Sequence, residues 1–291
     1  MDLQTPFPYQ AEGAKWLAAM PQALLADEMG LGKSAQVVIA CDLVNAINIL
    51  IVCPAAVRIN WEREFHRFSP MDRPAHVLLT SKDKPGEGVN VVSYDLVAGN
   101  EKLRKQLKTL VWDVLVLDEA HYLKERSAKR TKALYGHAKH PGVMHSAKYV
   151  WRLSGTPMPN NASELYTHVR SAGIEKRSYW DFVYDFCEGF DSDYGYKITG
   201  VKNVTRLKSL LARFMLRRKK DQVMTELPPI TFTEVTVQRS KVDLDPWFYE
   251  NFKPIGIPAF LDGLKEVDQS LKVAMNVTKR GHHFNYCLLY T

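Results

Sequence analysis

Short apolar runs recur along the first half of the chain, each of the length of a strand that is buried on both faces. They occupy residues 23–26, 49–53, 89–92, 114–117 and 149–153. Longer segments with helical spacing lie between them, at residues 33–46 and 127–138. Strands that alternate with helices predict crossover units and a parallel sheet covered on both faces. We therefore expect an α/β fold before residue 160.

After residue 160 the pattern changes from buried strands to helices and aromatic clusters. Residues 161–172 and 205–216 have helical spacing, and the second of these segments has a basic face. Residues 179–196 are rich in aromatic and acidic side chains, which we interpret as a packed core rather than a base-stacking surface. The sequence thus predicts a helical protrusion beyond the sheet. Residues 231–237 alternate enough to predict one more strand, whereas residues 243–291 have no clear pattern.

Composition narrows the class of protein without naming it. Of the 291 residues 46% are hydrophobic and 24% are charged, which is ordinary for a globular protein. The sequence contains neither an apolar run of about 18 residues nor a secretory leader, so we expect an intracellular protein, cytoplasmic or nuclear, without a membrane partner. The cysteines at positions 41, 53, 187 and 287 are scattered, which indicates reduced thiols rather than a metal site.

The net charge of +7 is concentrated in two blocks. Residues 101–152 contain 12 Lys or Arg against 5 acids, and residues 206–220 contain seven bases and no acid. Such blocks suit a surface that meets phosphate, but charge alone is equally compatible with solvated helix faces. Both interpretations stay open for Lys124, Lys129 and Arg130 in the first block.

The segment from Asp27 to Ser34 has the pattern of a phosphate-binding loop. It follows an apolar strand and opens a helix, and Gly30 and Gly32 allow backbone N–H groups to converge on an anion. Lys33 would then reach the β- and γ-phosphates, and the Ser34 hydroxyl would bind Mg²⁺. The general pattern has glycine where this chain has Asp27. The segment predicts a nucleotide site.

A carboxylate pair follows the apolar run at residues 114–117. Asp118 and Glu119 would stand at the carboxyl end of a strand, where parallel sheets bind ligands. Asp118 can hold the Mg²⁺, and Glu119 can orient and deprotonate an attacking water. Together with Lys33 these residues are the predicted catalytic set of a nucleoside triphosphatase.

These motifs resemble the ATP site of helicase superfamily two, and specifically that of the SWI/SNF-type DNA translocases. Aspartate at position 27 is typical of that group, and residues 7–13 resemble its adenine-reading Q motif, with Gln10 as the base contact. The resemblance implies a RecA-like parallel sheet with a P-loop, flanked by helices and carrying a helical protrusion. It also implies ATP and Mg²⁺ as cofactors. Residues 184–200 resemble a compact subgroup that includes annealing helicases and small bacterial or viral members.

Other segments resemble the family's DNA and coupling motifs, in the family's order. Residues 52–61, 92–94 and 216–229 resemble its DNA-strand motifs and its basic hallmark. The implied DNA contacts are Arg58, Ser93, Tyr94, Arg217 and Arg218. Residues 153–161 resemble the motif that links hydrolysis to DNA movement, through Ser154, Gly155 and Thr156. His121 is implied to couple the γ-phosphate site to that loop. The amphipathic pattern around Trp61 favours core packing over base stacking.

The resemblance also divides the chain into three parts. Residues 1–160 would form the RecA-like lobe core, residues 161–229 the protrusion and basic hallmark, and residues 230–291 a final strand and an atypical tail. No motif of the family's second RecA-like lobe, which supplies arginine fingers, follows in this sequence. We therefore expect such a lobe as a partner, in cis or in trans.

Two functions remain open on the sequence. The first is the ATP-binding lobe of an ATPase that translocates on duplex or branched DNA through its backbone phosphates. The second is a nucleotide- and DNA-binding module that does not hydrolyse ATP and acts with a partner lobe or protein. A plain P-loop kinase fits less well, because Gln10 and the basic hallmark at residues 216–229 would have no role in it.

Overall fold

The computed structural model describes residues 3–137, 140–193, 195–223, 274–275 and 286–287. The chain divides into two units, Met1–Pro228 and Pro229–Thr291. Of the second unit the structure describes an antiparallel pair, β12 (Ala274–Met275) and β13 (Tyr286–Cys287). The strand predicted at 231–237 and the prolines at 228–229 lie outside the described residues.

A seven-stranded sheet forms the centre of the first unit, with the strand order β11-β1-β8-β5-β2-β4-β3. Every neighbouring pair in this sheet is parallel, which confirms the predicted α/β class. In chain order the strands are β1 (Gln22–Leu25), β2 (Ile49–Cys53), β3 (Ala75–Val77), β4 (Val89–Ser93), β5 (Trp112–Leu117), β8 (Ala147–Leu153) and β11 (Met215–Leu216).

The central strands are buried because both faces of the sheet are covered. Ile49 and Ile51 of β2 contribute to one apolar cluster, whereas Leu50 and Val52 contribute to the other. Alternate residues of a strand point to opposite faces, so an unbroken apolar run is what such a strand needs. All five predicted strands are confirmed: the strand at 49–53 has the predicted ends, and the ends of the other four differ by at most two residues.

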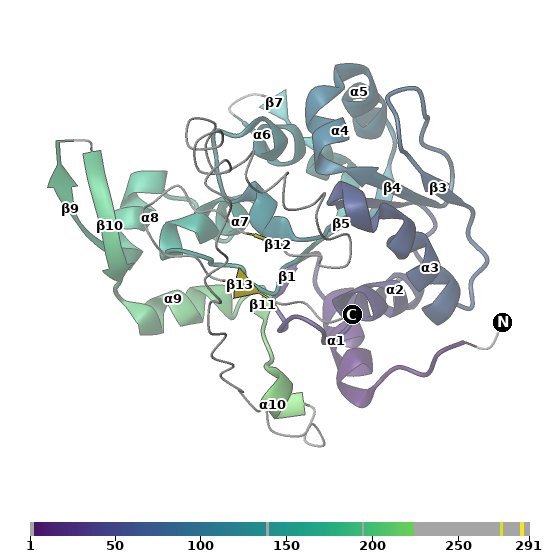
Figure 1. The fold of residues 1–291 in the computed structure, drawn as a ribbon, viewed down its shortest axis with the longest axis horizontal. Helices are drawn as coiled ribbons and strands as arrows, with labels where there is room; N and C mark the ends of the chain where they lie inside the picture. The colour runs from purple at the N-terminus through teal and green to yellow at the C-terminus, as the bar shows by residue number, and fades with distance from the viewer. Residues whose placement is uncertain (1–2, 138–139, 194, 224–273, 276–285, 288–291) are drawn as a thin grey trace, which may run out of the picture. The chain divides into compact units, whose positions relative to one another are not determined.

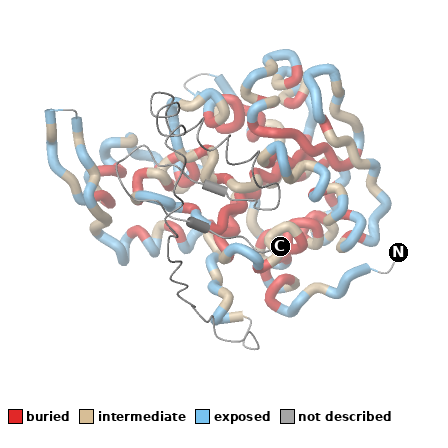
Figure 2. Tube along the Cα trace, viewed as in Figure 1, coloured by how far each residue is buried: buried red, intermediate tan, exposed pale blue. Residues whose placement is uncertain are grey.

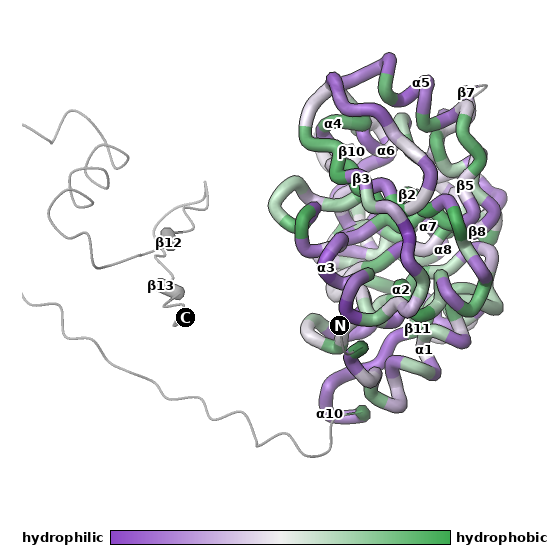
Figure 3. The backbone as a smooth tube through the Cα atoms, turned by 90° about the vertical axis from the view of Figure 1, so that its right-hand side faces the viewer, coloured by the Kyte–Doolittle hydropathy of each residue, from purple (hydrophilic) through white to green (hydrophobic). Residues whose placement is uncertain are grey.

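Helices flank the sheet on both sides (Figure 1). They are α1 (Pro8–Ala18), α2 (Lys33–Leu43), α3 (Arg58–Phe68), α4 (Tyr94–Gly99), α5 (Glu101–Thr109), α6 (Lys129–Tyr135), α7 (Tyr166–Ser171), α8 (Tyr179–Phe186), α9 (Val204–Leu211) and α10 (Lys220–Val223). Short 3₁₀ turns are η1 (Ala55–Val57), η2 (Ala120–Leu123), η3 (Val143–Ser146) and η4 (Ala162–Leu165). In Figure 3 the outer helices α3 and α5 carry mostly hydrophilic colour, as expected of their solvent-facing sides.

All four predicted helices end earlier than the sequence suggested, and two of them end because the chain continues into a strand. The helix expected over 127–138 ends at Tyr135, because Gly136 adopts φ +83° and the chain turns into a short pair, β6 (Gly136–His137) with β7 (His140–Pro141). The helix expected over 205–216 ends at Leu211, and Met215–Leu216 instead pairs with β1 as the edge strand of the central sheet.

The protrusion beyond the sheet contains strands as well as helices. It consists of α7, α8, α9 and an antiparallel hairpin of β9 (Cys187–Ser192) and β10 (Gly195–Val201), which the sequence analysis did not predict. The hairpin lies at one end of the lobe and is largely exposed (Figure 2). Phe182, Phe186 and Phe214 are fully buried beneath it in a third apolar cluster.

No helix in the described part of the chain is long and apolar enough to cross a membrane. The three-part division of the chain at residues 160 and 229 stays a prediction. The return of β11 to the central sheet places the residues that follow it beside β1, and therefore beside the predicted P-loop.

Candidate ATP site

The predicted P-loop joins β1 to α2 at the carboxyl edge of the sheet. Gly30 has φ +86° and Gly32 has φ +65°, a left-handed conformation that favours glycine. Gly32 is also the N-cap of α2, so Lys33 and Ser34 open the helix. The backbone N–H groups of such a turn, together with the helix dipole, favour an anion at this point.

Lys33 folds back over the loop. Its ammonium donates hydrogen bonds to the carbonyl oxygens of Asp27 (2.9 Å) and Glu28 (3.3 Å). Burial lowers the pKa of Lys33, and the nearby carboxylates of Glu119 and Asp118 act in the opposite direction. The P-loop and the carboxylate pair therefore lie within electrostatic reach of each other, as the predicted catalytic set requires.

Asp27, where the general pattern has glycine, is fully buried. Its carboxylate forms an ion pair with Arg218 and accepts hydrogen bonds from the Arg218 backbone N–H (3.0 Å) and from Gln36 Nε2 (3.0 Å). Arg218 also donates to the carbonyl oxygen of Tyr9 (2.6 Å) and to Gln36 Oε1 (2.7 Å). The aspartate thus fixes the P-loop to the segment that follows β11.

Arg217 and Lys220 extend this attachment. Arg217 Nη1 donates to the carbonyl oxygens of Ala26 (2.9 Å) and Gly155 (3.3 Å), and the Lys220 backbone N–H donates to Glu28 Oε2 (2.8 Å). The family resemblance predicts that Arg217 and Arg218 contact DNA. The structure gives both guanidinium groups partners around the P-loop, and Arg218 is fully engaged there.

Asp118 follows β5 and is held from three directions. Trp61 Nε1 donates to Asp118 Oδ2 (2.9 Å), the Glu119 N–H donates to Oδ1 (2.9 Å), and the Tyr94 hydroxyl donates to the Asp118 carbonyl oxygen (2.7 Å). Burial raises the pKa of Asp118, while the bond from Trp61 acts to lower it. Trp61 is a core residue as expected, but its role in orienting Asp118 was missed, because no local pattern links the two positions.

Glu119 connects the acidic motif to the predicted coupling loop. Its backbone has φ +50°, which is uncommon for a residue with a side chain and occurs often at functional sites. His121 Nδ1 lies 3.2 Å from Glu119 Oε2 and 3.4 Å from Ser154 Oγ, which in turn accepts the Thr156 N–H (3.2 Å). The predicted neighbours Glu119, His121 and Ser154 are therefore in contact, although the coupling role itself stays a prediction.

Gly155 borders the P-loop directly. A Cβ atom added at Gly155 would lie 2.5 Å from the Met29 side chain and 3.6 Å from Lys33 Nζ. Glycine at this position therefore allows the loop after β8 to approach the predicted phosphate site closely.

Gln10 lies behind the P-loop rather than in open space. It is buried, its Oε1 accepts the Phe7 N–H (3.0 Å), and its Nε2 donates to the Leu31 carbonyl oxygen (3.4 Å). A Cβ added at Gly32 would come within 2.3 Å of this amide nitrogen. The structure thus joins Gln10 to the loop, and its contact with adenine stays a prediction.

Three residues that were assigned to DNA have internal partners in the lobe. Tyr94 is 2% exposed and stacks on Tyr122, so its ring belongs to the interior of the lobe, and its contact with DNA stays a prediction. Ser93 is buried and caps α4 through the Leu96 N–H, and its contact with DNA likewise stays a prediction. Arg58 donates to the carbonyl oxygens of residues 55, 78 and 79.

The first basic block is also partly internal. Lys124 forms an ion pair with Glu164 (2.7 Å), and Arg130 lies over the Tyr122 ring (5.2 Å). Arg152 is fully buried. The charge of this block is therefore not a direct measure of a DNA surface.

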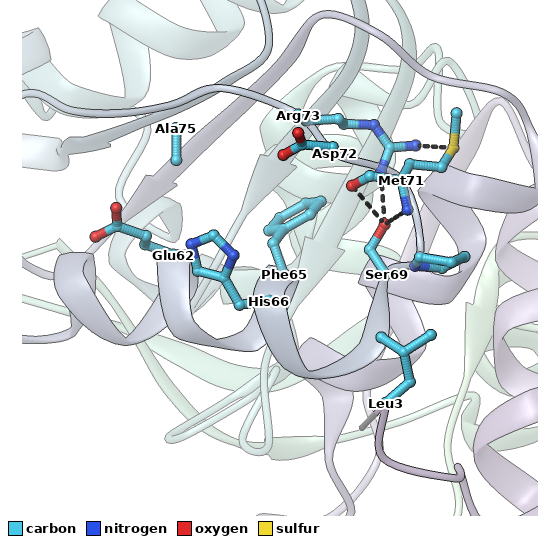
Figure 4. A pocket seen from close by; sticks show the side chains of 10 residues that line it. Leu3, Glu62, Phe65, His66, Ser69, Met71, Asp72, Arg73 and Ala75 are labelled. Carbon is cyan, nitrogen blue, oxygen red and sulfur yellow. Dashed lines mark hydrogen bonds between the residues drawn. The ribbon is translucent and has the colours of Figure 1, made fainter. Parts of the chain in front are cut away.

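A hollow of about 400 Å³ lies elsewhere, between the N-terminal segment and the end of α3 (Figure 4). Its lining includes Leu3, Phe65, Met71 and Arg73, and it shares no residue with the predicted ATP site. Within the described ranges no group of three or more His, Cys, Asp or Glu side chains could hold a metal ion. The three cysteines at 41, 53 and 187 are buried and free.

The fold and these loops define a P-loop protein, with its phosphate-binding turn, its acidic motif and the predicted coupling loop at one edge of a parallel sheet. Comparison with known proteins identifies its family. The SNF2-related domain matches residues 9–283, and the chain belongs to this family.

Relatives and a solved structure agree with this assignment. The chain is 33% identical over 231 residues to a SWI/SNF-related matrix-associated actin-dependent regulator of chromatin subfamily A-like protein 1 from Xenopus tropicalis, covering 76% of this chain and 23% of the relative. It is 31% identical to the ATP-dependent helicase fft3 of Schizosaccharomyces pombe over 77% of this chain and 26% of that protein. The SWI2/SNF2 ATPase core of Sulfolobus solfataricus, solved in complex with double-stranded DNA, matches with a TM-score of 0.60 at 26% identity, over 78% of this chain and 49% of that one.

The chain therefore spans about a quarter of the length of these curated relatives and about half of that ATPase core. The sheet and its helices match the RecA-like part of the core, which confirms the predicted fold.

We predict that Arg218→Ala destabilises the lobe strongly. Removal of the guanidinium leaves the Asp27 carboxylate buried without its partner, which typically costs about 3–5 kcal/mol. The matched variant Arg217→Ala loses only hydrogen bonds to two carbonyls and should cost about 1 kcal/mol. Urea unfolding measures both, and the double variant Asp27→Gly/Arg218→Ala should recover much of the loss. Equal costs for Arg217→Ala and Arg218→Ala would contradict the ion pair's importance.

We also predict that Trp61→Phe makes the site sensitive to acid. The indole N–H lowers the pKa of Asp118 against the effect of burial, so its removal raises that pKa further. As pH falls, the variant should lose Mg²⁺-dependent nucleotide binding at a higher pH than wild type, and at neutral pH binding should weaken about 10-fold. Trp112→Phe is the control, because its indole bonds the Leu107 carbonyl instead. A pH profile of nucleotide binding that is identical in wild type and Trp61→Phe argues against this role.

Proposed function

We propose that this chain is the ATP-binding lobe of a DNA-dependent ATPase that translocates on duplex DNA. The observation that carries the proposal is geometric: the loops with Lys33, with Asp118–Glu119 and with Ser154 follow the neighbouring strands β1, β5 and β8, Gly155 borders Lys33, and His121 contacts Ser154. The family assignment and the relatives named as ATP-dependent helicases support it.

ATP and Mg²⁺ fit the donors present at this edge. Backbone N–H groups of the P-loop and the Lys33 ammonium suit the phosphates, which would offer Lys33 charged partners in place of two neutral carbonyls. The Asp118 carboxylate and the Ser34 hydroxyl are oxygen donors of the kind that Mg²⁺ takes together with phosphate and water. Bound Mg²⁺ would supply charge neutralisation at the β- and γ-phosphates.

Glu119 is proposed as the group that activates water. The attacking water bonds to the γ-phosphorus, the bond to the β–γ bridging oxygen breaks, and Glu119 takes the water's proton. The contact from Glu119 through His121 to Ser154 supports a route by which the phosphate site and the coupling loop, Ser154 to Thr156, respond to each other.

A second RecA-like lobe, in cis or in trans, is proposed as a partner. Charge that develops on the γ-phosphoryl group is met in this family by arginine fingers from that lobe, and such a group is worth about 10³–10⁵ in rate. The match to about half of a SWI2/SNF2 ATPase core supports the need for a further part. Duplex or branched DNA is proposed to bind to the protein through the DNA's backbone phosphates. The protein is proposed to act in the cytoplasm or the nucleus.

Nucleotide binding and turnover test the enzymatic part. Lys33→Ala should weaken Mg²⁺-ATP binding about 10- to 150-fold in calorimetry, because a charge-assisted phosphate contact contributes about 1.5–3 kcal/mol. Lys132→Ala, which removes an exposed lysine of α6, should leave binding unchanged. A second lobe added in trans should raise phosphate release, and Glu119→Gln should abolish that gain while nucleotide still binds. Nucleotide binding without any gain would favour the non-hydrolysing module.

DNA binding is tested by its dependence on salt. If about three to five phosphates are neutralised, log K should fall against log salt with a slope of roughly −3 to −4, without sequence preference. The exposed Lys129 follows the acidic motif, and Lys129→Ala should reduce the slope by about 1. The control is Lys148→Ala: Lys148 lies at the start of β8 and is paired with Asp113, so its removal should leave the slope unchanged. A slope near zero would contradict the proposal.

A further inference from the structure

The helix α8 in the protrusion presents aromatic residues on two opposite sides. Phe182 and Phe186 are buried in the protrusion's core, whereas Trp180 is 45% exposed and Tyr184 is 53% exposed. Trp180 and Tyr184 stack with ring centroids 5.8 Å apart, and Tyr196 of β10 meets Tyr184 edge-on at 5.3 Å. We call these three residues, Trp180, Tyr184 and Tyr196, the aromatic platform.

Other rings of the protrusion already hold cations of the same chain. Arg126 lies over Tyr179 (4.3 Å), Arg206 lies over Phe186 (5.8 Å), and Lys197 lies over Phe190 (6.0 Å). The platform is different: within the described ranges, its rings have no such cation. Since a ring face attracts ammonium and guanidinium groups, the platform offers unused sites for cations.

The charged residues next to the platform also favour a cationic ligand. The elements α8, β9 and β10 contain four acids (Asp181, Asp185, Glu188 and Asp191) and one base, Lys197. Asp185 is paired with Arg177 and Arg206, but Glu188 and Asp191 form no ion pair with any residue that the structure describes. With Arg177, Lys202 and Arg206 from the flanking segments included, the protrusion is close to neutral, so the attraction is local: the carboxylates of Glu188 and Asp191 attract cationic side chains to this side of the hairpin.

From these two observations we infer that the aromatic platform is a docking surface for a Lys/Arg-rich segment of a partner protein. Its cationic side chains lie on the faces of Trp180 and Tyr184, and Glu188 and Asp191 on the adjacent hairpin attract the remaining positive charge. The surface lies at the end of the lobe that carries the hairpin (Figure 1), apart from the ATP site, so the inference does not depend on the proposed function.

Fluorescence anisotropy with the full 291-residue chain tests the inference. The probe is a labelled decapeptide of alternating arginine and glycine, with a glutamine–glycine peptide and an oligothymidine strand of matched length as comparisons. We expect the arginine peptide to bind, more weakly at high salt, and the other two probes to bind at least tenfold more weakly.

Substitutions separate the cation–π contact from simple apolar contact. Trp180→Leu retains apolar area but removes the π face, and should weaken peptide binding roughly 2- to 5-fold. Trp180→Phe should retain most of the affinity, and Trp180→Leu/Tyr184→Leu should weaken it about tenfold. Glu188→Lys with Asp191→Lys should weaken it further. The matched control is Val111→Ala. Val111 is exposed and lies in another loop, so its substitution should leave peptide binding unchanged.

The outcomes are distinct. Loss of peptide binding in the leucine variants, with ATP binding unchanged, supports the inference whether or not the chain hydrolyses ATP. Peptide binding that is equal in wild type and the double leucine variant overturns it. Preferential binding of oligothymidine that depends on Trp180 also overturns it, because the platform would then be a base-stacking surface. An unchanged circular dichroism spectrum shows that each variant is folded.

Discussion

The buried ion pair between Asp27 and Arg218 is the contact on which the geometry of the phosphate site depends. A carboxylate with no exposed surface needs a charged partner, and this one comes from 191 positions along the chain. That partner is available only after the chain has built the protrusion and returned as β11 beside β1. The conformation of the P-loop therefore depends on the completed lobe. Through Asp27 the loop is held by a long-range contact as well as by its own turn.

The other loops at the same edge of the sheet are connected in a similar way. Trp61 and Tyr94 hold Asp118, and His121 lies between Glu119 and the hydroxyl of Ser154. Residues that resemble strand-binding motifs thus act inside the lobe, as supports of the acidic motif. A change in the segments that carry Trp61 and Tyr94 would therefore reach Asp118 through one hydrogen bond.

The buried strands and the chemical motifs could be predicted from the sequence, whereas the residues that contact those motifs in the folded lobe could not. Continuous apolar runs such as 49–53 specify a strand covered on both faces, and glycines at 30 and 32 specify a left-handed turn before a helix. The hairpin β9–β10 was missed because only its first residue, Cys187, is fully buried and three glycines interrupt its pattern, and β11 because two residues carry no period. The burial of Tyr94 and the pairing of Arg218 follow from long-range packing, which no local pattern encodes.

Arg152 belongs to the first basic block but is fully buried, so the number of basic residues in a segment does not locate a binding surface. This buried guanidinium instead organises a hydrogen-bond network. It donates to the hydroxyls of Tyr135 and Ser171 and lies against the Tyr135 ring, and Tyr135 in turn bonds His168. Burial, together with Arg152, lowers the pKa of His168 to about 3, so the imidazole stays neutral in its hydrogen bond with the Tyr135 hydroxyl. This network joins α6 and α7 to β8 two residues before Ser154. The network therefore fixes α7 to β8, the strand whose carboxyl end leads into Ser154.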